Sequence, residues 1–136
     1  MKKYIKRPVM GTSKKQLYDR KQALFDKATA RNDELGNSRG QSSRVIFNDE
    51  ERIEYSKLEL IGMLHSIFTY EDYTTVPEIM QDRYIAKYIN ELGYDTVEEI
   101  VQQEFDYFNE HATVSHNTFV DYEGLPYNSV RWDDEV

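Results

Sequence analysis

The chain of 136 residues contains no cysteine, which excludes disulfide frameworks, thiolate metal sites and cysteine nucleophiles. Long apolar runs are also missing. None approaches the ~18 residues that a membrane-spanning helix needs, so we expect no membrane partner. The first residues are basic and lack the apolar segment of a secretory signal. We therefore expect a protein of the cytoplasm or of a virus particle.

Recognisable motifs for catalysis, metal binding and nucleotide binding are missing as well. His65, His111 and His116 are the only histidines, and they lack the His-Glu-x-x-His spacing of zinc proteases. The glycine-containing stretches at 11–15 and 36–40 do not match the phosphate-loop pattern. Carboxylates are abundant, but no pattern singles out a pair for acid–base chemistry. The sequence predicts no catalytic residue, no metal ligand and no cofactor.

Charge is unevenly distributed along the chain. Residues 1–44 hold twelve cations and four anions, a net charge of +8, whereas the rest holds five cations and 21 anions, a net charge of −16. Such asymmetry favours electrostatic docking, onto another molecule or between copies of the chain. The competing interpretation is an ordinary polar surface on which the charges are unevenly distributed by chance.

Four segments combine an apolar stripe at helical spacing with a capping pattern at the start. The pattern predicts helices over 13–35, 48–69, 75–92 and 96–110, the last two joined tightly at Gly93. The last three should form the core, because the stripe of the first is narrow. Each expected cap pairs a polar residue with Glu or Gln three positions later: Ser13 with Gln16, Asn48 with Glu51, Thr75 with Glu78, and Thr96 with Glu99.

The predicted fold class is all-α, a small bundle of about four helices with irregular ends. We divide the chain, as one domain overall, into a basic arm and first helix (1–44), a helical core (45–111) and a C-terminal tail (112–136). The boundary at 44 follows a polar linker at 37–43.

The tail is polar but rich in aromatic residues, unlike an ordinary disordered tail. Its pattern is compatible with a short strand over 118–122, a turn at Glu123-Gly124 and then an extended, acidic end. We expect the tail to bind either the body of the protein or a neighbouring molecule.

These features predict a non-enzymatic assembly component that docks through its two irregular ends into a larger complex, with a phage particle as the preferred setting. The partner would be a protein or another copy of the chain. The candidate partner-binding residues lie in the arm (Lys2, Lys3, Lys6, Arg7, Lys14 and Lys15) and in the tail (Phe119, Tyr122, Tyr127 and Trp132).

Two alternatives remain open at the level of the sequence. The acidic body is compatible with an inhibitor that imitates the phosphates of nucleic acid, as some phage anti-defence proteins do. The basic segment is compatible with nucleic-acid binding, because its lysines and arginines can neutralise phosphates. The acidic body opposes that approach, so we favour a protein partner.

Overall fold

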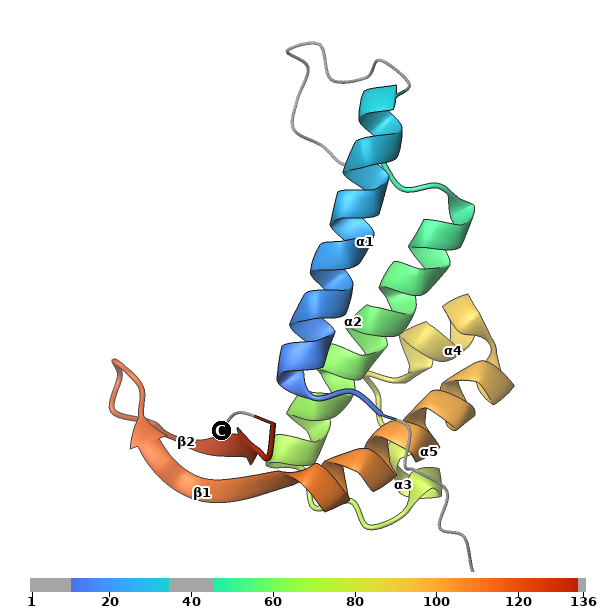
Figure 1. Cartoon of the computed structure of the whole chain (residues 1–136). Helices are drawn as coiled ribbons and strands as arrows, with labels where there is room; N and C mark the ends of the chain where they lie inside the picture. The colour runs from blue at the N-terminus through green and yellow to red at the C-terminus, as the bar shows by residue number, and fades with distance from the viewer. Residues whose placement is uncertain (1–10, 35–45, 135–136) are drawn as a thin grey trace, which may run out of the picture.

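The computed structural model of the chain describes residues 11–34 and 46–134. Within them, α1 (Lys14–Glu34) and α2 (Asp49–Tyr70) lie side by side and antiparallel (Figure 1). Three shorter elements follow: α3 (Val76–Met80), α4 (Ala86–Leu92) and α5 (Tyr94–His111). The chain then forms β1 (Ala112–Val120) and β2 (Pro126–Trp132), which project away from the helices.

The all-α prediction and the irregular tail are therefore wrong. β1 and β2 form a two-stranded antiparallel sheet, in register from Ala112 opposite Trp132 to Val120 opposite Pro126. A bulge interrupts the pairing between Ser115 and Phe119. β-Branched and aromatic residues favour a pleated surface, and the turn after Val120 brings the second strand back onto the first. The sequence showed this turn, but not that the extended end beyond it pairs with the first strand.

The first three predicted helix starts are confirmed; at the third, Thr75 caps α3 and its Oγ1 accepts from the Glu78 N–H at 3.4 Å. Ser13 Oγ accepts from the Gln16 N–H at 3.2 Å, and Gln16 Oε1 accepts from the Ser13 N–H at 3.1 Å. Asn48 and Glu51 form the same reciprocal pair, at 2.8 and 2.9 Å. Each of these reciprocal pairs satisfies two backbone donors that have no partner within the helix.

The single helix predicted over 75–92 is wrong, because a turn at 81–85 separates α3 from α4. Asp82 lies within this turn: its Oδ1 accepts from the Tyr84 N–H at 2.8 Å, and its Oδ2 accepts from the Tyr73 hydroxyl at 2.8 Å. A short carboxylate that bonds nearby backbone competes with helical hydrogen bonding. The helical spacing of apolar residues over 75–92 does not reveal that Asp82 competes for backbone hydrogen bonds.

The cap predicted at Thr96 is also wrong. α5 begins at Tyr94, directly after Gly93, whose φ of 89° is readily available only to glycine. Gly93 ends α4 as well, so the tight pairing of the last two helices is confirmed. Thr96 therefore lies inside the first turn of α5.

The main core forms between the last three predicted helices, as expected. Fully buried residues include Leu60 and Leu64 of α2, Ile79 of α3, and Val97 and Val101 of α5. None of the helices in the described ranges is long and apolar enough to cross a membrane.

The first helix packs closely along the second. Leu17, Leu24 and Ala28 are buried, and Leu17 and Leu24 form a second apolar cluster with Leu58 and Ile61 of α2. This narrow stripe packs against α2, and two arginines of α1 add ion pairs across the same contact: Arg20 with Glu54 and Arg31 with Glu51.

Candidate functional site

Only two of the six basic residues predicted to bind a partner lie in the part of the chain that the structure describes. Lys14 and Lys15 lie in the first turn of α1 and are exposed. Lys2, Lys3, Lys6 and Arg7 lie outside the described residues, as does the linker at 37–43.

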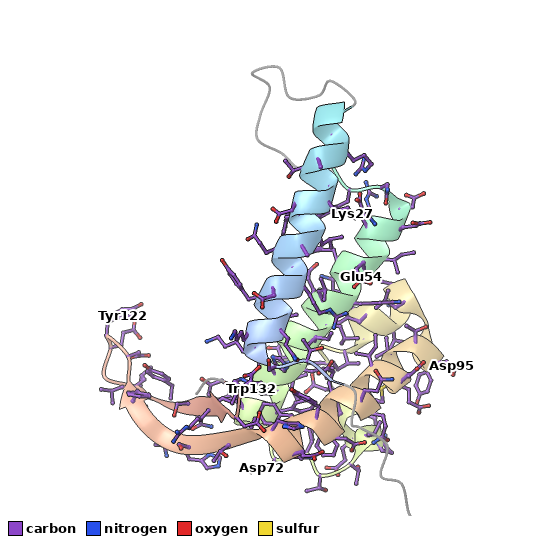
Figure 2. The ribbon with its side chains drawn as sticks, in the orientation of Figure 1. Lys27, Glu54, Asp72, Asp95, Tyr122 and Trp132 are labelled. Carbon is purple, nitrogen blue, oxygen red and sulfur yellow. The ribbon has the colours of Figure 1, made fainter. Side chains whose placement is uncertain are left out.

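The four predicted tail residues separate into two groups. Trp132 is 2% exposed, and its ring centroid lies 4.9 Å from that of His65 and 5.3 Å from that of Phe108. It therefore anchors the base of the hairpin on α2 and α5. Phe119, Tyr122 and Tyr127 lie in the outer half, and Figure 2 shows Tyr122 at the free end, away from Trp132.

The outer end of the hairpin is an exposed apolar surface, which we call the tip. Tyr122 is 96% exposed, and Phe119 and Tyr127 stack across the strands with ring centroids 5.7 Å apart. Val120 and Leu125 extend this surface and are also exposed. An exposed apolar cluster of this kind is typical of an interaction surface.

The turn at the tip is held in one conformation by Asp121. Its Oδ1 accepts from the N–H groups of Glu123 and Leu125, each at 2.9 Å. The Gly124 N–H donates to the Asp121 carbonyl at 3.0 Å, and Gly124 has a φ of 80°. Such a turn is fixed before any contact, which reduces the entropy lost on binding.

A groove runs between the hairpin and helices α1 and α2, with a volume of about 520 Å³. Its lining includes Leu17 of α1 and His65 of α2, and Phe119 and Tyr127 belong to its hairpin wall. Gly62 lies on the helical wall, where Lys21 Nζ is 4.0 Å from the position that a Cβ would take. Lys14 lines the groove as well, so the groove combines aromatic and aliphatic side chains with polar ones and has ammonium groups beside it.

The hairpin stays in place because its base is tied to the start of the described chain. Thr12 is buried; its N–H donates to Glu104 Oε2 at 2.9 Å, and its carbonyl lies 2.9 Å from His65 Nε2. Ser13 Oγ donates to Asp134 Oδ2. We call this set of contacts the clasp. It joins α2, α5 and both ends of the described chain.

Burial changes the acidity of two clasp residues. It lowers the pKa of His65 from 6.5 to about 4, and it raises the pKa of the Glu104 carboxyl. Hydrogen bonds from Thr12 partly offset the rise at Glu104. Shifted pKa values are common at catalytic sites, but structural networks produce them too. Here both side chains are occupied with the backbone of Thr12, so a structural role is sufficient.

Neither a metal site nor the alternative of nucleic-acid mimicry gains geometric support from the described residues. No group of three or more His, Asp or Glu side chains there is arranged to hold a metal ion. Glu51 and Glu104 are buried, so neither can belong to an acidic surface that imitates nucleic acid.

Sequence reasoning missed Val120 and Leu125 of the tip and the helical wall of the groove. The first pair had a signal, because both flank the Glu123-Gly124 turn. No signal in the sequence could have revealed the groove, because it forms only where the helical wall that contains Gly62 and His65 lies beside the hairpin. Comparison with known protein families, curated proteins and solved structures finds no match to this chain.

Proposed function

We propose that the protein is a non-enzymatic assembly component that docks through the tip of its C-terminal hairpin. The observation that carries this proposal is the apolar tip, which projects beyond the helices and exposes Tyr122, Val120 and Leu125 to solvent. The proposed partner is a protein with an apolar pocket bordered by cations. This replaces the expected docking through an irregular tail with docking through a fixed turn.

The chemistry of the tip favours a protein over nucleic acid. Asp121 and Glu123 place two carboxylates beside the exposed rings, and they would repel phosphates. Tyr122 and Leu125 offer large apolar side chains on a rigid turn, the kind of anchor that contributes most to protein interfaces. Burying each would contribute about 1.5–3 kcal/mol.

Site-specific photo-cross-linking tests the proposal in the cells where the protein occurs. A photoreactive amino acid at Tyr122 should yield a protein adduct, which mass spectrometry identifies. The control is the same amino acid at Tyr94, which is 52% exposed. Tyr94 adjoins Asp95, on the opposite side of the molecule from Tyr122 in Figure 2.

Binding is then measured with the identified partner and this chain, both purified. The double substitution Tyr122→Ser, Leu125→Ser should weaken binding strongly, whereas Tyr94→Ser should leave it unchanged. The proposal fails if Tyr122 gives no protein adduct, or if the tip substitutions leave the affinity unaltered.

A further inference from the structure

We propose that the partner of the tip is a second copy of this chain, and that each tip inserts into the groove of the other copy to form a closed dimer. The inference rests on the proposed function, because the same tip does the docking. Its support is the chemistry of the two surfaces: the tip is apolar and acidic, and the groove is largely apolar with lysines beside it.

The groove has the properties that the tip requires of a partner. Aromatic and aliphatic side chains form the larger part of its walls, with the polar side chains of Ser66, Thr69, Asn128 and Ser129 among them. Its volume of about 520 Å³ falls in the about 300–1,000 Å³ range of sites that hold a drug-sized molecule. The rings and aliphatic side chains at the tip would fill this space without placing a charge inside it. Tyr122 and Leu125 are the two side chains that we assign to it.

The charges are also complementary. Lys14 lines the groove, and Lys21 lies close enough for its charge to lower the pKa of His65. Lys14 and Lys21 are seven residues apart on α1, so they share one helix face. The carboxylates of Asp121 and Glu123 would approach this face as the tip enters, and unlike charges would align the two copies.

The position of the groove favours a closed pair over an open chain. The hairpin itself forms one wall of the groove, so the tip at the end of the hairpin lies beside the groove. Two copies related by a twofold axis can therefore exchange tips in one encounter, and both tips and both grooves are covered.

Analytical ultracentrifugation of the purified full-length chain over a wide concentration range tests the inference. Wild type should shift from monomer to dimer as concentration rises. Tyr122→Ser with Leu125→Ser should raise the dissociation constant about a hundredfold or more. Both tips of the dimer carry the substitutions, so the burial of Tyr122 and Leu125 is lost in both grooves. Tyr84→Ser with Tyr94→Ser, two exposed tyrosines outside the hairpin, should leave the constant unchanged.

A charge-reversal experiment identifies the groove as the receiving surface. Lys14 lines the groove, and Lys21 Nζ lies beside Gly62 in its helical wall, so Lys14→Glu with Lys21→Glu makes this region acidic and should abolish the homodimer. Lys15→Glu with Lys27→Glu is the matched control, because it makes the same change in charge on exposed residues of the same helix that do not line the groove.

Glu123→Lys neutralises the tip without disturbing the turn, which depends on Asp121. This variant alone should dimerise weakly. When it is mixed with the acidic-groove variant, a heterodimer should form more readily than either homodimer, because the acidic tip of one copy then meets the basic groove of the other.

The inference is overturned if the wild type stays monomeric at every concentration, if the tip substitutions leave dimerisation unchanged, or if the two α1 double variants behave alike. Failure here is distinguishable from failure of the proposed function. A monomeric chain whose Tyr122 still cross-links to a different protein refutes only the dimer, whereas no adduct to any protein refutes both.

Discussion

Acidification should destabilise the fold through His65, because this side chain is buried in its neutral form. Its Nε2 lies 2.9 Å from the carbonyl oxygen of Thr12. A carbonyl oxygen can only accept a hydrogen bond, so Nε2 carries the proton of the neutral ring. Burial against the base of the hairpin lowers the pKa of His65 from 6.5 to about 4, and the nearby charge of Lys21 adds to this effect.

The sign and size of the effect follow from this pKa. In the unfolded chain His65 gains a proton near pH 6.5, but in the folded chain only near pH 4. Between these values the unfolded state binds more protons, so the free energy of unfolding falls as the pH is lowered. At about 1.4 kcal/mol per pH unit the full loss is about 3 kcal/mol, and it is complete below pH 4.

Urea unfolding at a series of pH values between 7 and 4 measures the effect, with fluorescence of the single tryptophan as the signal. Trp132 is buried against His65, so its emission reports directly on this region. His65→Gln keeps a donor for the Thr12 carbonyl but does not titrate. The free energy of unfolding of wild type minus that of this variant should therefore fall by about 3 kcal/mol across the range.

Taking this difference removes the contributions of other groups. Glu104 acts in the opposite direction, because its raised pKa makes acidification favour the folded state. His116→Gln is the control, since His116 is exposed. A difference between wild type and His65→Gln that stays constant with pH would refute the reasoning, as would a His116 variant with the same effect.

The remaining predictions concern backbone fit and capping, and the same urea titration at neutral pH checks them. Gly11→Ala should cost about 1–3 kcal/mol, because its Cβ would lie 2.1 Å from Tyr107 Cβ. Gly62→Ala should instead stabilise by up to ~1 kcal/mol, because its Cβ would meet Leu17 at an ordinary 3.7 Å and alanine favours helix. Equal effects of these two substitutions would contradict the packing described here. Asn48→Ala should cost about 1 kcal/mol through loss of the α2 cap, and an unchanged urea midpoint would contradict that role.

Periodicity and capping chemistry were enough to locate most helices from the sequence. The stripes of α2 and α5 are long and regular, and the caps at Ser13 and Asn48 depend only on residues three positions apart. Local rules failed where a distant or competing contact intervened. Asp82 accepts from the Tyr84 N–H within the turn that breaks the predicted third helix, and its other oxygen accepts from the Tyr73 hydroxyl; the apolar stripe reveals neither contact.

By itself the sequence pointed to Phe119, Tyr122 and Tyr127 and to the turn at Glu123-Gly124 that presents them, because these features depend on neighbours in the chain. Only the tertiary structure decided that Trp132 anchors the hairpin while Tyr122 faces solvent, although both are aromatic residues of the same segment. The groove likewise exists only because contacts between distant residues, such as Thr12 with Glu104, hold the hairpin beside α1 and α2. Burial and long-range packing are properties of the folded chain, and composition does not encode them position by position.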